Sequence, residues 1–482
     1  MRSVAASVIL VSVIAFSAMP LRAATNGLDA RFGTGGIVLL GPTQGSGISI
    51  DRISALAVRN DGTILIAGRT VGTSDPGAGR DLAAIGRLDA NGNWDQGFAD
   101  NGLFVLPYGA TSAPYGGSID NIGFFSDSRI IASGGTRQFS SYYFSCTLLI
   151  KLTMGGSLDT SFAPDHSGNY CFDFAPPPSG YWFGHFDGMQ VDSDDTFFLT
   201  SPSTNLTRGA VAHLDSNGIL VSSYATNGVA ALPEGLYGNL LQLASDHTLI
   251  VAGVGINVSG QSLGASSLST TGAVDATFGT NGIYAADAQS GEVGPAYSAR
   301  DAQGRILVSS NDFTGDGNLP YRLARITATG AADLTFNGGS QQPGSPGVAV
   351  PVVSGNFQYD YLVAAQPLPD GHILAVGDAG YAAVSDGSTF NIALLRFNDD
   401  ASFDAAFGDA VHPGWSSINI GGSANSSGVV GAFTTDSANR AYVAISTSDA
   451  NGKNCWGLLR LIPDRLVDHG FDDIPVMPTC PQ

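Results

Sequence analysis

Basic residues are scarce in this sequence of 482 residues. Asp and Glu together number 41, whereas Lys and Arg number 21, of which only two are Lys. The formal net charge is −20, so the chain should repel the phosphates of nucleic acids and anionic lipids, and no nucleic-acid partner is expected. The predominance of Arg over Lys favours fixed two-pronged pairing with carboxylates.

Long apolar runs are also scarce. The one candidate is the run from Val4 to Met19, which follows Arg2 and ends in small residues near Ala23, as secretory signal peptides do. A membrane anchor is the alternative, but the run contains Ser residues and is shorter than the roughly 20 residues of a spanning helix. We expect residues 1–23 to be a signal peptide, and the mature chain to be secreted or periplasmic without membrane insertion.

Helical periodicity is lacking, since no apolar spacing of the helical kind persists beyond two turns. Instead, short apolar runs such as residues 55–58, 64–68 and 82–88 are separated by turn residues, among them Asp61-Gly62. The chain holds 64 Gly and 23 Pro. Short strands at close spacing predict an all-β ring or barrel-like array.

The chain is built from repeats. Residues 28–37 return nearly intact at 274–283, and each copy of the motif carries an Asp three residues before an aromatic ring. The pairs are Asp29 with Phe32, Asp95 with Phe98, Asp159 with Phe162, Asp275 with Phe278, Asp333 with Phe336, Asp404 with Phe407 and Asp468 with Phe471, and a degenerate copy has Val221 with Tyr224. Eight motifs bound seven units of 54 to 71 residues, a length that suits a blade of four short strands.

The pattern Gly-x-Leu/Val-Asp-x-x-Phe-Gly-x-x-Gly, clearest at residues 272–282, resembles the delta-60 repeat of bacterial secreted β-propeller proteins. The resemblance implies a seven-bladed β-propeller with four-stranded blades over residues 24–472, followed by a tail of residues 473–482, and it implies no chemistry. Several copies depart from the pattern: Ala99, Ala163, Asn337 and Asp472 replace the Gly after the ring, and Ala401 and Arg465 replace a turn Gly. We expect distorted loops there.

A cation stands eight residues before most motif carboxylates. The cations are Arg87, Lys151, Arg325, Arg396 and Arg460, ahead of Asp95, Asp159, Asp333, Asp404 and Asp468, whereas His213 precedes Val221 and Ser267 precedes Asp275. We expect each motif Asp to cap its own turn or to pair with this cation. A repeated anion-binding site is the alternative, but a residue that recurs in nearly every blade is more simply part of the scaffold.

The four cysteines fall at matched places in two units. Cys146 lies 13 residues before Asp159 and Cys171 nine after Phe162, and Cys455 and Cys480 have the same offsets from Asp468 and Phe471. Of the three possible connectivities, this equivalence favours Cys146 with Cys171 and Cys455 with Cys480 in an oxidising compartment. The second bridge would tie the tail to the last blade.

The first motif has no strands before it. Residues 36–40 should therefore complete the sheet of the seventh unit and close the ring. The disulfide-tied tail could compete for the same place.

Groups that carry chemistry are sparse. The seven His residues show no metal-ligand spacing, and no catalytic residue, metal or cofactor is expected. Residues 89–95 place oxygen ligands at alternate positions, but they lack the Gly and the distal Glu of calcium loops, so a plain turn is the better interpretation. The four Trp residues occupy unrelated repeat positions, unlike the docking motif of quinone-dependent propeller dehydrogenases.

One stretch that departs from the repeat, residues 175–187, supplies candidate ligand contacts. Tyr181, Trp182, His185 and Asp187 could stack on and bind a sugar or peptide. The alternative, that these rings belong to the core of the third blade, is the more ordinary one.

These observations favour an exported, non-catalytic binding or scaffold protein of the bacterial envelope or the extracellular space. We expect a monomer with a protein or polysaccharide partner. The alternative is a propeller enzyme, a lyase or glycosidase, with carboxylates at the axial channel. The two differ in whether acidic, His or Tyr side chains of several blades meet at a channel mouth.

Overall fold

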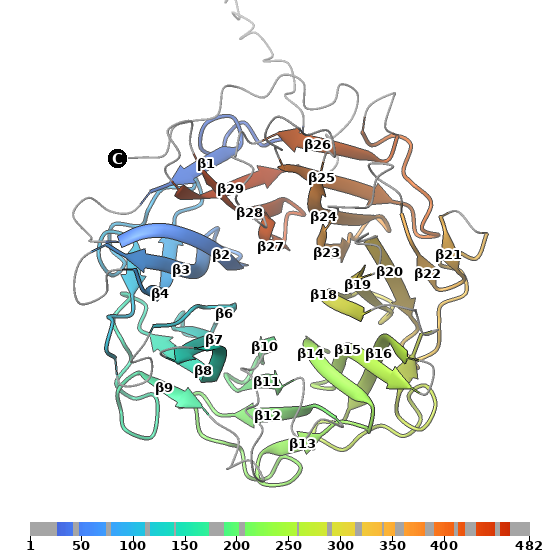
Figure 1. Ribbon diagram of the computed structural model, residues 1–482, viewed down its shortest axis with the longest axis horizontal. Coiled ribbons are helices and arrows are strands. Elements are labelled where there is room, and N and C mark those ends of the chain that lie inside the picture. Colours follow the sequence, from blue (N-terminus) through green and yellow to red (C-terminus); the bar gives the residue numbers. More distant parts are fainter. Residues whose placement is uncertain are drawn as a thin grey trace, which may run out of the picture.

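The structure is a computed structural model. It describes residues 27–41, 48–73, 79–110, 116–138, 141–172, 188–201, 208–257, 260–286, 292–313, 321–339, 342–351, 361–380, 390–408, 413–419, 430–448 and 454–462. All 29 elements in these ranges are β-strands. They form seven antiparallel sheets arranged as blades around a central axis (Figure 1).

Each blade begins with its innermost strand, and successive strands lie farther from the axis. Blade 1 comprises β2 (Ile48–Val58), β3 (Ile64–Gly72), β4 (Asp81–Leu88) and β5 (Leu103–Val105). Blade 2 comprises β6 (Asn121–Phe124), β7 (Ile130–Gln138), β8 (Ser141–Leu152) and β9 (Asn169–Phe172). Blade 3 comprises β10 (Gly188–Val191), β11 (Phe197–Ser201), β12 (Ala210–Leu214) and β13 (Val229–Ala231).

The second half of the ring repeats this order. Blade 4 comprises β14 (Leu236–Leu243), β15 (Leu249–Asn257), β16 (Gly260–Leu268) and β17 (Tyr284–Ala285). Blade 5 comprises β18 (Glu292–Arg300), β19 (Ile306–Phe313), β20 (Tyr321–Ile326), β22 (Val348–Ala349) and β21 (Gly344–Ser345). Blade 6 comprises β23 (Tyr361–Pro367), β24 (Ile373–Gly380), β25 (Phe390–Phe397) and β26 (Trp415–Asn419). Blade 7 comprises β27 (Val430–Thr435), β28 (Ala441–Ser448), β29 (Asn454–Leu461) and β1 (Ile37–Leu40).

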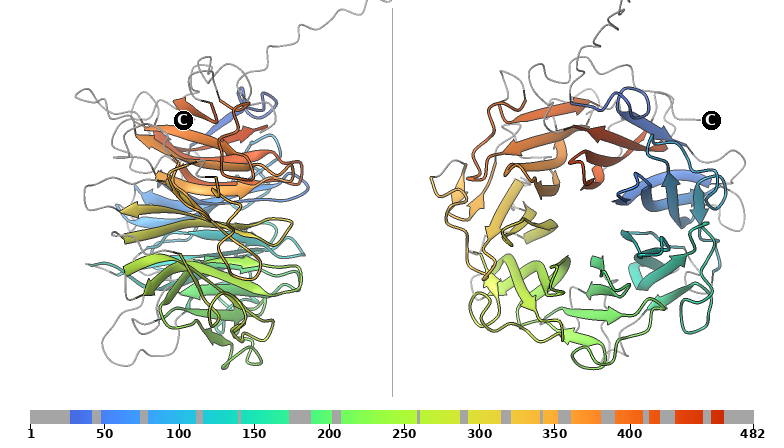
Figure 2. Two further views of the ribbon diagram at one scale, coloured as in Figure 1. Left: turned by 90° about the vertical axis from the view of Figure 1, so that its right-hand side faces the viewer. Right: turned by 180° about the vertical axis from the view of Figure 1, so that it is seen from behind.

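The prediction of a seven-bladed, four-stranded propeller is therefore confirmed, with one local difference. In blade 5 the segment after the motif ring contributes a fifth, two-residue strand, β21, which pairs with β22. Asn337 organises this insertion, because its amide donates to the carbonyls of Gln342 at 3.0 Å and Val348 at 2.9 Å. Seen edge-on, the ring is a flattened disc (Figure 2).

The core lies between the blades. Seven clusters of buried apolar side chains occur, and each draws its members from two adjacent blades. Between blades 5 and 6, for example, Phe336 and Leu323 pack against Leu395, Phe397 and Ala401. No blade buries both of its faces alone, which is why the repeat has to be a ring.

The ring closes through the N-terminal strand, as the sequence predicts. Strand β1 pairs with β29 from Ile37 opposite Leu459 to Leu40 opposite Trp456. The pairing extends beyond the strand, since the N–H of Asp29 donates to the carbonyl of Arg460 at 2.8 Å. Blade 7 thus takes its outermost strand from the other end of the described chain, and this pairing covers the edge of β29.

One end of the ring carries seven equivalent hairpins. Because the strands are antiparallel, the turn from the first to the second strand and the motif from the third to the fourth lie at this same end, called the motif end below. In blade 1 the N–H of Gly62 donates to the carbonyl of Arg59 at 2.9 Å, and the N–H of Arg59 donates to the carbonyl of Thr63 at 2.9 Å. This is a type I turn with a bulge, in which only Gly62 is left-handed (φ +88°).

The positions where Gly is replaced keep the left-handed backbone of the repeat. Ala99, Ala163, Asn337 and Ala401 stand where other units have Gly, and all four are left-handed, with φ of 45°, 75°, 54° and 71°. The hydrogen bonds of the turn are retained, since the N–H of Ala401 donates to the carbonyl of Asn398 at 3.1 Å. The expected distortion is therefore confined to the longer loops after Ala163 and Asn337, because the interface imposes the backbone geometry at the replaced positions themselves. Arg465 and Asp472 lie outside the described residues.

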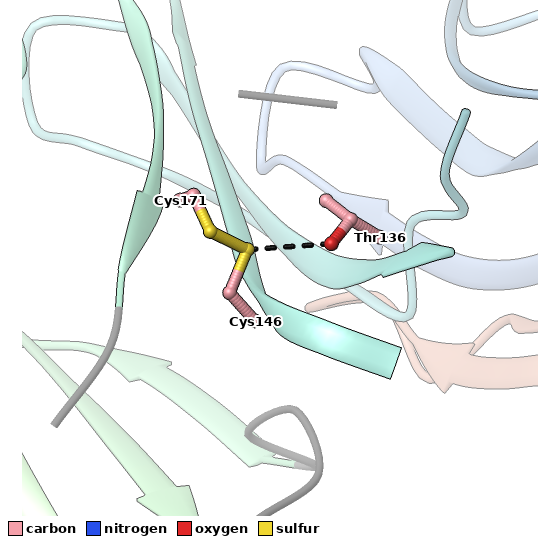
Figure 3. Close-up of a disulfide and its surroundings, with 3 residues drawn as sticks. All are labelled: Thr136, Cys146 and Cys171. Atoms are coloured by element: carbon pink, nitrogen blue, oxygen red, sulfur yellow. Dashed lines mark hydrogen bonds between the residues drawn. A yellow bond between two sulfur atoms is a disulfide. The ribbon is translucent and has the colours of Figure 1, made fainter. Parts of the chain in front are cut away.

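A disulfide joins the two outer strands of blade 2. Cys146 on β8 is bonded to Cys171 on β9, with a Cα–Cα distance of 5.6 Å, and Thr136 lies 3.3 Å from the Cys146 sulfur (Figure 3). This confirms the first predicted bridge. Cys455 is also disulfide-bonded, and its expected partner Cys480 lies outside the described residues. No helix suited to crossing a membrane occurs in the ranges given above.

Ala401 supplies a test of the imposed backbone geometry. Replacing Ala401 by Gly should raise the free energy of unfolding by about 0.5–1 kcal/mol, because Gly adopts positive φ without steric cost. The matched change, Gly218→Ala, should lower stability, because the equivalent Gly has φ +81° and a Cβ would lie 2.7 Å from the ring of Phe162. Urea unfolding measures both changes, and equal effects of the same sign would contradict this explanation.

Candidate functional site

The motif carboxylates use both oxygens within the scaffold. In blade 5, Oδ1 of Asp333 accepts the N–H of Thr335 at 3.1 Å and its hydroxyl at 2.6 Å, while Oδ2 lies 2.7 Å from Nε of Arg325. The side chains of Asp333 and Arg325 are almost completely buried. Both roles expected for the motif Asp, turn cap and ion-pair partner, therefore occur in the same residue.

The same ion pair recurs around the ring. The pairs are Arg87 with Asp95 at 2.9 Å, Lys151 with Asp159 at 3.5 Å, Arg325 with Asp333 at 2.7 Å and Arg396 with Asp404 at 3.2 Å. In blade 7 Arg460 binds Asp29 at 3.0 Å, a partner that the sequence analysis did not name. The partner expected there, Asp468, lies outside the described residues. Ring closure accounts for the contact with Asp29, because it brings the first motif to the last blade.

The cation also contacts the motif ring. The guanidinium carbon of Arg325 lies 4.7 Å from the centre of the Phe336 ring, and that of Arg460 lies 4.5 Å from the ring of Phe32. Both rings are fully buried. A cation held over a desolvated aromatic face is attracted by the ring quadrupole, so carboxylate, cation and ring form one unit.

In blades 7, 2 and 1 the cation of this unit also binds the next blade. Arg460 donates to the carbonyl of Ala90 at 2.7 Å, Lys151 donates to that of Ser216 at 2.5 Å, and Arg87 donates to that of Met154. All three acceptors occupy the second position of the turn that follows the third strand in the neighbouring blade. In addition, the residue after the motif ring donates its backbone N–H to the carbonyl of the third residue of that turn. This bond occurs at six interfaces, for example from Ala99 to Gly155 at 2.8 Å.

Blades 3 and 4 lack the ion pair but keep the backbone of the motif. His213 replaces the cation in blade 3, stacks on Phe198 with ring centres 4.2 Å apart and lies 2.8 Å from the hydroxyl of Thr196. Burial lowers the pKa of His213, which favours its neutral form. The N–H of Val221 still donates to the carbonyl of His213 at 2.9 Å, as the motif Asp does elsewhere.

The geometry favours the scaffold role of the motif over an anion site, because the cations are already occupied by carboxylates, carbonyls and rings. The same holds for residues 89–95. Asp89 accepts the N–H groups of Asn91 and Asn93, each at 2.9 Å, as a turn Asp does. In the described part of the chain, no group of three or more His, Cys, Asp or Glu side chains is placed to hold a metal ion.

The predicted ligand contacts Tyr181, Trp182, His185 and Asp187 lie outside the described residues. The structure instead shows a pocket of about 560 Å³ at the motif end, formed by the hairpins of blades 1, 2 and 3. We call it the blade 1–3 pocket. Its lining residues are Val58, Arg59, Asn60, Asp61, Phe124, Phe125, Ser126, Val191, Asp192, Ser193 and Asp195.

The blade 1–3 pocket combines an aromatic ring with charges of both signs. The guanidinium carbon of Arg59 lies 5.2 Å from the ring centre of half-buried Phe124. Asp195 accepts the N–H and the hydroxyl of Ser126, both at 2.6 Å, which links blades 2 and 3. The only trace of this pocket in the sequence is the acidic run at residues 192–195. The sequence gives no indication that this run lies beside residues 59 and 124.

Two side chains from neighbouring blades meet at this pocket. Nδ1 of His247, in the hairpin of blade 4, lies 2.7 Å from Oδ2 of Asp192, whose carboxylate is almost fully buried. The hydrogen bond and the negative charge of Asp192 raise the pKa of the exposed His247. The enzyme alternative expects acidic, His or Tyr side chains of several blades to meet at a channel mouth. This contact meets that expectation only in part, because it joins one carboxylate to one histidine from two blades.

Comparison with known proteins supports the fold. A family model described as a β-propeller domain of unknown function, DUF5122, matches residues 368–407. This range runs from the hairpin before β24 to the motif ring Phe407, so it covers β24, β25 and the motif of blade 6. The match agrees with the expected β-propeller fold, but the description of the matching family does not mention the delta-60 repeat. No curated protein matches the chain.

Several solved structures resemble the chain at low identity. A protein of unknown function from Dyadobacter fermentans is 11% identical and matches over 88% of this chain and 99% of its own, with a TM-score of 0.42. The β-propeller domain of the Trilobed protease from Pyrococcus furiosus is 8% identical over 85% and 94%, with a TM-score of 0.39. The polysaccharide lyase Uly1 is 9% identical over 73% and 90%, with a TM-score of 0.35. These likenesses carry no argument about function.

The ion pairs predict a pH dependence that Asp159 makes measurable. Burial alone would raise the pKa of Asp159, but hydrogen bonds from Ser161 and Arg129 and the charge of Lys151 outweigh it and lower the pKa to about 2. A lowered folded pKa stabilises the fold above the unfolded value of 3.8, and this contribution is lost as the pH falls toward 2.

We therefore expect Asp159→Asn to lower the free energy of unfolding by about 2 kcal/mol at neutral pH, and this difference from the wild type should shrink between pH 4 and pH 2. Urea unfolding at several pH values measures it. Asp275→Asn is the control, since Asp275 caps its turn without a cation. A difference that stays constant down to pH 2 would refute the assignment.

Proposed function

We propose that this protein is an exported binding or scaffold protein of the bacterial envelope or the extracellular space, and that it takes its partner at the blade 1–3 pocket. The observation that carries the proposal is the convergence of three hairpins, from three blades, on a pocket of about 560 Å³ with a half-buried ring and charged rims. The disulfide between Cys146 and Cys171 supports an oxidising compartment.

The chemistry of the pocket favours a hydroxylated partner such as a polysaccharide. Phe124 offers an apolar face that suits the C–H face of a sugar. The carboxylates of Asp192 and Asp195 keep acceptor capacity beyond their bonds inside the protein, and Arg59 supplies donors. One Arg and three Asp line the pocket, so an anionic polymer is disfavoured.

The second candidate is a propeller enzyme acting on the same class of polymer. The contact that favours it is the one between Asp192 and His247 at 2.7 Å, because a buried carboxylate beside a histidine suits proton transfer. A lyase or glycosidase would bring a second acidic or basic group to the bond that is cleaved. A binding protein would bind the polymer without turning it over, whereas an enzyme would turn the same polymer over.

A glycan and peptide array with the purified protein tests the proposal. We expect saturable binding to a neutral glycan. The affinity should fall about tenfold in Phe124→Ala and in Arg59→Gln, because Arg59 lies against the Phe124 ring and the two side chains form one contact surface. Tyr361→Ala is the control, since Tyr361 is an exposed ring on the inner strand of blade 6. Binding that is unchanged in both pocket variants would contradict the proposal.

The enzyme alternative is tested with the glycans that bind. Release of reducing ends or of unsaturated products would show turnover. If Asp192→Asn abolished this release, the protein would be an enzyme and the binding proposal would be wrong. We expect no such release.

A further inference from the structure

A second pocket at the motif end lies between blades 5 and 6. It has a volume of about 260 Å³ and is lined by the hairpin of blade 5, the hairpin of blade 6 and the side chains Arg325 and Asp399. We call it the blade 5–6 pocket. It is lined by three Arg residues and two Asp residues, the opposite balance to the blade 1–3 pocket.

Two of these arginines are already paired. Arg305 lies 2.6 Å from Asp301 and 2.7 Å from Asp399, and Arg325 lies 2.7 Å from Asp333 and 2.7 Å from Asp399. The hydrogen bond from Arg305 and the charge of Arg325 lower the pKa of Asp399, although burial acts in the opposite direction. This network forms one charged wall of the pocket and has little left to offer a ligand.

Arg300 differs from both. The residue as a whole is half-buried, its Nη1 is buried without a hydrogen-bond partner, and the side chain makes no hydrogen bond or ion pair with any described residue. Arg300 acts electrostatically on Asp246 in blade 4. Hydrogen bonds from Thr248 are the main cause of the lowered pKa of Asp246, and the positive charge of Arg300 is a smaller cause. A buried guanidinium donor without an acceptor is costly unless something else satisfies it.

Arg300 is also exceptional within the repeat. It is the last residue of the innermost strand, at the position paired with the first residue of the second strand. The seven residues at this position are Val58, Phe124, Val191, Leu243, Arg300, Pro367 and Thr435. Arg300 alone among them is charged, so the blade scaffold does not require a cation there.

We propose that the blade 5–6 pocket binds a small monocarboxylate, of the size of a hydroxy acid or one uronic acid, with Arg300 as its anchor. A carboxylate presents two acceptor oxygens to the guanidinium fork. A doubly charged phosphate fits less well, because Asp301 and Asp399 line the same pocket. The site is separate from the blade 1–3 pocket, so the proposal does not depend on the proposed function.

Isothermal titration of the purified protein with lactate and with glucuronate tests the site and separates a free acid from a uronic acid. We expect saturable binding of at least one of them, and no binding of glucose at the same concentration. Arg300→Gln should weaken binding about 10- to 100-fold, the value of one charge-assisted hydrogen bond. Inorganic phosphate should bind more weakly than the carboxylate.

The control is Arg52→Gln, which removes one exposed arginine of an inner strand in blade 1 and should leave the affinity unchanged. Thermal unfolding separates binding from folding, because Arg300→Gln should not lower the melting temperature of the ligand-free protein. No saturable binding of either carboxylate, or equal affinity in the wild type and Arg300→Gln, overturns the proposal. Phe124→Ala should keep carboxylate binding, so failure of one pocket leaves the other testable.

Discussion

In blades 1, 2, 5 and 7 a cation at the end of the third strand serves two blades at once, and the ring depends on this contact. In blade 7, Arg460 binds Asp29 of the motif, lies over Phe32 and donates to the carbonyl of Ala90 in blade 1. Breaking such a buried pair leaves a charge unpaired in a dry interface, which costs far more than the loss of an exposed ion pair. The motif therefore fixes the angle between neighbouring blades as well as its own turn.

This arrangement explains why the motif tolerates some changes and not others. Positions after the ring accept Ala or Asn, because what the interface needs is a left-handed backbone and an N–H for the next blade. In blade 3, His213, Val221 and Tyr224 replace the charged unit, and stacked rings fill the same space. The backbone hydrogen bonds are common to all the blades, and the ion pair is added to them.

The fold could be predicted from the sequence because it is repeated: Asp and Phe recur in register, and the matched offsets of Cys146 and Cys171 gave their disulfide. The partner of Arg460 could not be found in this way, because local register points to Asp468, whereas ring closure presents Asp29 from the other end. The pockets were missed for the same reason. Arg59, Phe124 and Asp192 are far apart in sequence and meet only because blades 1 to 3 are neighbours. That Arg300 lacks a partner is likewise visible only in three dimensions.

The most direct test of the account compares Asp29→Asn with Asp468→Asn in urea unfolding. The two carboxylates stand in equivalent copies of the motif, and Asp29 binds Arg460 across the closure of the ring. The account predicts that Asp29→Asn lowers the free energy of unfolding by a few kcal/mol, on the order found for broken buried ion pairs, and that Asp468→Asn leaves it nearly unchanged. A larger loss in Asp468→Asn than in Asp29→Asn would contradict it.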